Sequence, residues 1–127
     1  MGIRVEISNE DEGYIEYLVI HEDGSIGSAD LRIMDFDKGH HMERVLRTHN
    51  IHHGYLIAET FFYPHSATSN RRCGIGSQVL DYILSDAKAR GVCVVYAQPT
   101  NVIAINFFRK KGFRHDQNAH WYHLLNQ

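Results

Sequence analysis

The sequence is poor in cysteine and has no long apolar run, and each shortage excludes a class of protein. Cys73 and Cys93 are its two cysteines, too few for the disulfide framework of a small secreted domain, so a reducing interior is expected. The longest apolar runs, such as VCVVYA at 92–97, are too short to span a bilayer. The N-terminal segment also lacks the apolar core of a signal peptide. We therefore expect a cytoplasmic protein with no membrane partner.

An excess of charge of one sign is missing as well. Thirteen Lys and Arg residues against fifteen Asp and Glu residues give a net charge of −2. General nucleic-acid surfaces and polybasic membrane surfaces need a cationic excess, so the composition predicts no nucleic-acid partner, although it leaves room for a local basic pocket. The hydrophobic content of 43% is ordinary for a globular protein, and the length of 127 residues predicts a single domain over 1–127.

The hydrophobic pattern predicts alternating strands and helices in the second half of the chain. A buried-strand pattern at 92–98 lies between two amphipathic helix patterns, and a strand at 55–63 precedes them. A strand–helix–strand unit implies a right-handed parallel crossover, so we predict an α/β (α+β) fold with a mixed central sheet. The predicted elements are, in chain order, strands at 3–8, 14–20 and 25–34, a short helix within 36–50, the strand 55–63, a helix from 75 that stops at Gly91, the strand 92–98, a helix at 102–111, and strands near 113–117 and 120–125.

Residues 70–76 read NRRCGIG, a glycine-containing stretch that leads into the predicted helix. The first N–H groups of a helix lack intrahelical partners and lie at the positive end of its dipole. The two glycines let this backbone approach an anion closely, and the two arginines add positive charge. A tight strand-to-helix turn is the alternative explanation. A dinucleotide fingerprint is excluded because Val79 stands where a third glycine is needed, and no P-loop string occurs.

Two stretches together resemble one known family, the GNAT acetyltransferase superfamily. RRCGIGSQVL at 71–80 is similar to its motif of Gln or Arg, two residues, Gly, one residue, and Gly or Ala. NVIAINFFRKKGF at 101–113 is similar to its second motif, with Asn, Ala, an aromatic residue, Lys and a final Gly-Phe in order. Two motifs in the right order, separated by one helix and one strand, are more specific than either alone. The resemblance covers residues 55–125 well and the first fifty residues poorly.

The resemblance implies a GNAT-like fold in which acetyl-CoA lies between two parallel strands, 55–63 and 92–98, that splay apart. It implies that backbone amides of 72–77 hold the pyrophosphate, that the pantetheine arm runs along 55–63, and that Asn101 bonds this arm from the other side. A plain helix cap is the alternative role for Asn101. The cofactor contacts implied in this way are Phe61, Phe62, Tyr63, Arg71, Arg72, Cys73, Gly74, Ile75, Gly76, Ser77, Asn101, Asn106 and Phe108.

Glu59 is the candidate catalytic base for acetyl transfer to an amine. Period-two alternation places it on one face of its strand with Ile57 and Phe61, and a carboxylate among apolar neighbours tends to have a raised pKa, as a base near neutrality requires. The sequence also resembles a branch of the family, including histone acetyltransferases, that has a glutamate at this place. The alternatives are an ion pair with a buried arginine or a position facing solvent. Phe108 stands where many family members have an acidic tyrosine.

The resemblance implies an N-acetyltransferase that moves an acetyl group from acetyl-CoA to a primary amine by direct attack in a ternary complex. The implied acceptor is a small-molecule or protein amine. Dimers are common in the family, but nothing in the sequence decides whether this protein forms a homodimer. Six histidines between 40 and 65 lack defined zinc-site spacing, so no metal site is predicted. The alternative to an acetyltransferase is a non-catalytic acyl-CoA sensor. The absence of the family's tyrosine at position 108, where this chain has phenylalanine, favours it. Residues 9–13 are also too few for the two helices that the family usually has there, so only 35–53 could replace them.

Overall fold

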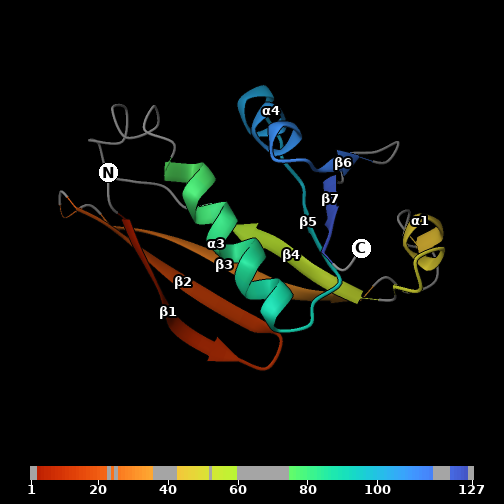
Figure 1. Cartoon of the computed structure of the whole chain (residues 1–127), viewed down its shortest axis with the longest axis horizontal. Helices are drawn as coiled ribbons and strands as arrows, with labels where there is room; N and C mark the ends of the chain where they lie inside the picture. The colour runs from red at the N-terminus through yellow and green to blue at the C-terminus, as the bar shows by residue number, and fades with distance from the viewer. Residues whose placement is uncertain are drawn as a thin grey trace.

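The computed structural model describes residues 3–22, 24, 26–35, 43–51, 53–59, 75–115 and 121–125. Within these residues the strands form one seven-stranded sheet in the order β1-β2-β3-β4-β5-β7-β6 (Figure 1). The mixed α/β class predicted from the sequence is confirmed, because β4 and β5 are parallel and the other neighbouring strands are antiparallel. The elements are β1 (Ile3–Asp11), β2 (Tyr14–His21), β3 (Ile26–Asp35), α1 (Glu43–Arg47), β4 (His53–Glu59), α3 (Ile75–Ala89), β5 (Val94–Ala97), α4 (Val102–Lys110), β6 (Arg114–His115) and β7 (Trp121–Leu124).

The first four strands form an antiparallel meander, in which short connections join β1 to β2 and β2 to β3, and a longer segment that contains α1 joins β3 to β4. Gly13 lies in the turn between β1 and β2 with φ +77, and a Cβ on it would come within 2.8 Å of a methyl carbon of Ile33. Both the backbone conformation and this close approach require glycine. The predicted hairpin around Gly24 is present as the connection between β2 and β3. The turn that joins β1 to β2 leaves no space for helices, and α1 instead follows β3.

β4 and β5 are paired over a very short stretch. Their parallel register joins Tyr55 to Val95 and Leu56 to Tyr96, and within the described residues it goes no further. β4 nevertheless continues to Glu59, and Figure 1 shows β5 turning away from it toward α4. The predicted splaying of the two parallel strands is therefore confirmed. The predicted residues 60–63 of the first strand lie outside the described part of the chain.

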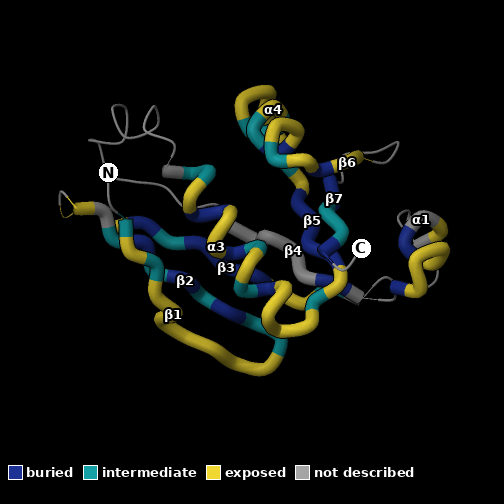
Figure 2. Tube along the Cα trace, in the orientation of Figure 1, coloured by how far each residue is buried: buried dark blue, intermediate teal, exposed yellow. Residues whose placement is uncertain are grey.

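The two faces of the sheet carry separate apolar clusters. α3 crosses one face in front of β2 and β3 (Figure 1), and the buried positions gather along these strands and on the inner side of the helix (Figure 2). Its amphipathic spacing, read from the sequence, accounts for this contact. The larger cluster contains Ile15, Tyr17, Val19, Ala29 and Leu31 of the sheet together with Val79, Leu80, Ile83 and Ala87 of α3. The smaller one contains Leu46, Ile51, Val94, Tyr96 and Tyr122.

A polar network fixes the C-terminal half of α3 to the first hairpin. The hydroxyl of Tyr17, whose ring is fully buried, donates to a carboxylate oxygen of Asp86 at 2.7 Å. Arg90 donates to the same oxygen at 2.8 Å and forms two further hydrogen bonds to Glu10, at 2.8 and 3.0 Å. Burial, and secondly the bond to Asp86, raise the pKa of the Tyr17 hydroxyl well above its usual value, so it remains a donor. No helix in the described ranges is long and apolar enough to cross a membrane.

We predict that removing either end of the Tyr17–Asp86 hydrogen bond lowers the free energy of unfolding, and that the two losses differ. Asp86→Ala should lower the free energy of unfolding by about 1–3 kcal/mol, because it leaves the buried Tyr17 hydroxyl without an acceptor. Tyr17→Phe should cost less, about 1 kcal/mol, because Asp86 keeps its bond to Arg90. Urea denaturation of both variants measures the difference. A larger loss in Tyr17→Phe would contradict the importance given to the buried hydroxyl.

Candidate functional site

The parting of β4 and β5 leaves backbone groups of β4 available on one edge. Ile57, Ala58 and Glu59 have no register partner on β5 within the described residues. The N–H and C=O groups of a strand point alternately to its two sides, so those of these residues that point away from β3 need a partner on the β5 side. An extended polar chain can pair with such an edge as an added strand. The arrangement is therefore suited to a long, narrow ligand that enters between the two strands.

A β-bulge interrupts β4 where it leaves β5. On the β3 side, Ile57 pairs with Leu31, but the next register pair joins Glu59 to Asp30, so Ala58 is an extra residue. An undisturbed ladder would have put Glu59 opposite Ala29 instead. The alternation that grouped Glu59 with Ile57 therefore does not continue through this strand, because a bulge shifts the pattern by one residue. The bulge places the predicted base opposite a second carboxylate residue.

Asp30 is a buried acid that the sequence reasoning missed. Only 4% of the residue is exposed. Its Oδ2 accepts a hydrogen bond from the Tyr14 hydroxyl at 3.2 Å and lies 3.8 Å from the Arg32 guanidinium, which also stacks over the Tyr14 ring at 5.2 Å. Its Oδ1 has no hydrogen-bond partner among the described residues. Burial, and secondly the bond to Asp30, raise the pKa of Tyr14, which keeps this hydroxyl protonated. The signal in the sequence was a charged residue between two apolar residues of a strand, Ala29 and Leu31.

The first turn of α3 lies beside a lysine from the end of α4. Nζ of Lys111 donates to Oγ of Ser77 at 2.7 Å and forms an ion pair with Asp81 one turn later. Gly76 and Ser77, both predicted as cofactor contacts, thus have a cation close to them. Lys111 belongs to the second motif, but nothing in the spacing indicated that it would reach α3. Ile75 begins the helix, and the other predicted loop residues, Phe61, Phe62, Tyr63, Arg71, Arg72, Cys73 and Gly74, lie outside the described part of the chain.

Asn101 caps α4, which is the alternative role considered for it. Its Oδ1 accepts from the Ala104 N–H at 2.8 Å, in the extended conformation expected of an N-cap residue. Asn106 is exposed, and its Oδ1 accepts from Arg109 at 3.0 Å. Phe108 is buried and packs against the rings of two neighbours on α4 and the following turn. The cofactor contacts predicted for these three residues stay predictions.

Tyr96 is a candidate donor at the last register pair before the strands part. It is fully buried, and burial raises its pKa to about 12. A thiol has a pKa of about 8.5, so a thiolate is too weak a base to remove this proton readily. The Tyr96 hydroxyl can therefore donate a hydrogen bond but is a poor acid for a leaving thiolate.

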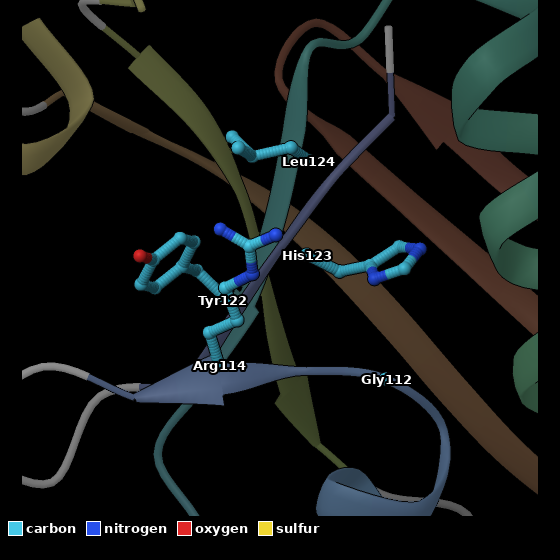
Figure 3. Close-up of a pocket in the computed structure, with 5 residues that line it drawn as sticks. All are labelled: Gly112, Arg114, Tyr122, His123 and Leu124. Carbon is cyan, nitrogen blue, oxygen red and sulfur yellow. The ribbon is translucent and has the colours of Figure 1, made fainter. Parts of the chain in front are cut away.

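A small hollow at β6 and β7 does not bring its side chains together. It is lined by Gly112, Arg114, Tyr122, His123 and Leu124. Figure 3 shows Arg114 and Tyr122 on one side of β7 and His123 on the other. The His123 ring is stacked on Phe113 with the centroids 5.2 Å apart. Within the described ranges no group of three or more His, Cys, Asp or Glu residues is placed to hold a metal ion.

Comparisons with known proteins agree with this geometry. The family model described as Acetyltransferase (GNAT) family matches residues 5–113. No curated protein matches the chain. The fold is similar to an acetyltransferase of the GNAT family from Staphylococcus aureus Mu50, with a TM-score of 0.62 and 18% identity over 90% of this chain and 69% of that one. It is also similar to a mutant of KacT, with a TM-score of 0.64 and 11% identity over 98% and 96% of the two chains.

The prediction that nucleic acid is excluded as a partner is wrong. The fold is similar to AtaT complexed with acetyl-methionyl-tRNAfMet, with a TM-score of 0.62 and 10% identity over 97% of this chain and 95% of that one. It is similar as well to the KacTA–DNA complex, with a TM-score of 0.61 and 15% identity over 91% and 70%. Net charge is an average over the whole chain, whereas polyanions are bound by local cationic patches. The described residues include one short cationic stretch of this kind, with Arg109, Lys110 and Arg114 all exposed.

The cap on α4 predicts how Asn101 variants differ. Asn101→Ala should lower the free energy of unfolding by about 1 kcal/mol, because the Ala104 N–H loses its acceptor. Asn101→Ser should retain most of the stability, since a serine hydroxyl caps a helix nearly as well. Thermal unfolding of the two variants measures this. Equal losses would show that the cap contributes little at this position.

Proposed function

The chain belongs to the acetyltransferase (GNAT) family, and from this premise we propose that residues 1–127 form one N-acetyltransferase domain. The proposed reaction transfers an acetyl group from acetyl-CoA to a primary amine by direct attack in a ternary complex. The observation that carries the proposal is the parallel pair β4 and β5, which parts after Leu56 and Tyr96. Among the described residues, β4 beyond Leu56 has no partner on β5, and the resemblance to the family implies that the cofactor arm binds along this strand.

The residues present fit acetyl-CoA, which supplies a thioester-bound acetyl group when it binds. The edge of β4 from Ile57 to Glu59 offers backbone donors and acceptors to the pantetheine arm. The first turn of α3 offers N–H groups that no helical carbonyl satisfies, at the positive end of the helix dipole. Gly76 removes a side chain from this turn, and the ammonium group of Lys111, which also pairs with Asp81, lies beside it. We assign the pyrophosphate to this turn, together with the loop residues Arg71, Arg72 and Gly74.

Glu59 is assigned the role of general base. An alkyl ammonium ion has a pKa of about 10.4, so the acceptor arrives protonated and has no lone pair with which to attack. The Glu59 carboxylate would take this proton and free the amine to bond the acetyl carbon, and the CoA thiolate that leaves as the carbon–sulfur bond breaks would take up the second proton lost by the nitrogen. The bulge leaves Ala58 without a register partner on β3, and we assign its N–H as the donor to the carbonyl oxygen that gains negative charge. Base and donor are thus adjacent residues of one bulge.

One observation favours a second function, a non-catalytic acyl-CoA sensor. Phe108 is buried where many family members have an acidic tyrosine, and the high pKa of Tyr96 makes it a poor replacement. The transfer reaction does not require such an acid, because a thiol with a pKa of about 8.5 leaves readily as a thiolate. We therefore favour the enzyme over the sensor.

Glu59→Gln tests the assignment of the base. We expect kcat to fall by about 100-fold to 10,000-fold, while the dissociation constant for acetyl-CoA stays unchanged. Glu12→Gln, in the exposed turn between β1 and β2, removes the same charge from a residue outside β4 and serves as the matched control. Turnover is followed as CoA-thiol release with lysine peptides, polyamines and aminoglycosides, and binding by calorimetry.

The outcomes of this experiment separate the two functions. Unchanged turnover in Glu59→Gln would remove Glu59 from the mechanism. Acetyl-CoA binding without thiol release for any amine would favour the sensor. Absence of acetyl-CoA binding would contradict both functions.

Lys111→Met tests the assignment of the pyrophosphate. Loss of a charge beside the bound anion should raise the dissociation constant for acetyl-CoA about fivefold or more. Lys110→Met is the matched control, because Lys110 is exposed at the end of α4. Calorimetry on the folded variants gives both constants. An equal effect of the two substitutions would mean that only the overall charge matters, and would contradict a specific role for Lys111.

A further inference from the structure

β1 is the long edge strand of the seven-stranded sheet. The strand order places β1 at one end of the sheet and the two-residue β6 at the other (Figure 1). β1 spans nine residues, Ile3–Asp11, and pairs with β2 on its inner side. No strand of the described structure pairs with its outer side, so a row of backbone N–H and C=O groups points outward there. A row of this kind is a template on which another strand can pair.

The regular part of this edge is the segment Ile3–Ile7, which we call the edge segment. After it, a bulge shifts the register of β1 with β2 between Ile7 and Asn9. Bulges bend an edge strand and reduce its capacity to pair with another strand. Beyond the bulge, Glu10 accepts two hydrogen bonds from Arg90, at 2.8 and 3.0 Å, which join this half of β1 to the end of α3. A partner strand can therefore pair in regular register with the edge segment.

The side chains of the edge segment alternate between apolar and charged residues. On the face toward α3, Ile3 and Val5 pack against the larger apolar cluster, while Ile7 is 38% exposed. On the other face, Nε of Arg4 lies 2.8 Å from a carboxylate oxygen of Glu6, and the two side chains are 68% and 49% exposed. The segment, IRVEI, thus has apolar residues at its ends and centre and opposite charges on the two sides of its centre.

This pattern is complementary to itself when a second copy pairs antiparallel about Val5. Arg4 then lies opposite Glu6 of the second copy, and the reverse, so that two opposite-charge pairs form across the contact. Directly opposite residues have Cβ atoms about 5 Å apart, and opposite charges at such positions stabilise the pairing. Ile3 lies opposite Ile7 of the second copy and covers its exposed side chain. Pairing about Arg4 or Glu6 instead would put like charges directly opposite, which is unfavourable.

We propose that two copies of this chain form a two-fold dimer by pairing their β1 strands antiparallel about Val5. The same segment is used on both sides of the contact, as two-fold symmetry requires. The two seven-stranded sheets then join into one continuous sheet. β2 and β3 separate the contact from the parting of β4 and β5, so this inference does not depend on the proposed acetyl transfer.

Charge reversal in the edge segment tests the dimer. Glu6→Arg makes both charged positions basic and Arg4→Glu makes both acidic, so like charges would lie opposite each other in either dimer. We expect the dimer dissociation constant, measured by sedimentation equilibrium, to rise about tenfold or more in each variant. Glu12→Arg, in the exposed turn after β1, is the matched control and should leave the constant unchanged. Wild-type protein that remains monomeric at about 100 μM would overturn the proposal.

Two recombinations of these variants separate a specific contact from a general effect of charge. An equimolar mixture of Glu6→Arg and Arg4→Glu should form a heterodimer, because each arginine then lies opposite a glutamate. The double variant Arg4→Glu/Glu6→Arg restores opposite charges within one chain and should regain the wild-type dissociation constant. If the wild-type protein dimerises but neither recombination restores the dimer, the proposal is overturned.

The exposed apolar residues of α4 provide a competing surface for association. Val102 and Ile103, in its first turn, are 71% and 78% exposed. A dimer that dissociates in Ile103→Asp but persists in Glu6→Arg would use that surface and overturn the proposal. A dimer that persists in Ile103→Asp and dissociates in Glu6→Arg supports pairing through β1.

Amide hydrogen exchange measures the pairing of the backbone directly. In the dimer, the outward N–H groups of the edge segment become hydrogen-bonded, so their exchange should slow as the protein concentration rises. The Glu6→Arg variant should show fast exchange at these amides at every concentration, with an unchanged unfolding temperature. A wild-type dimer whose edge-segment amides exchange as fast as in the monomer would overturn the proposal, whether or not the protein binds acetyl-CoA.

Discussion

Within the described residues two register pairs join β4 and β5, and the proposed function depends on the shortness of this contact. A longer parallel ladder would satisfy the backbone of β4 and close the sheet. Because the described ladder ends at Leu56 and Tyr96, the described part of β4 beyond Leu56 has no partner on β5. The opening is maintained from both faces, since α3 packs on one cluster and the region around α1 on the other.

Charged and polar contacts at the helix ends position α3 and α4, in addition to the packing of their apolar faces. The C-terminal half of α3 is joined to the first hairpin through Tyr17, Asp86, Arg90 and Glu10. Its first turn is joined to the end of α4 through Lys111. α3 is thereby fixed at both ends, and the N–H groups of its first turn keep a constant position relative to the opening. A mobile first turn would lose the preorganisation on which anion binding by a helix depends.

Periodic patterns were sufficient to predict the alternation of strands and helices, and two local motifs indicated the family. The parting of the parallel pair was predicted because the resemblance to that family implies it. The bulge at Ala58 could not be predicted from the sequence, because an extra residue in one strand is defined only by the register with the neighbouring strand. For the same reason Asp30 was missed: it becomes notable through its partner on β4 and its burial. Lys111 acts across 34 residues of sequence to reach Ser77, a distance that no local pattern encodes. The relationships that escaped prediction are those fixed by strand register or by contacts between side chains far apart in the sequence.

Asp30 also contradicts what stability alone would favour at its position. An apolar residue there would cost no desolvation and would continue the apolar character of β3, as Ala29 and Leu31 do. Departures from local consistency of this kind tend to occur at functional sites, where binding offsets the cost. In this sheet the departure coincides with the bulge, the end of the parallel ladder and the opposite glutamate. Folding requires neither the buried acid nor the bulge that sets Glu59 opposite it, and both lie next to the last described pair of β4 and β5.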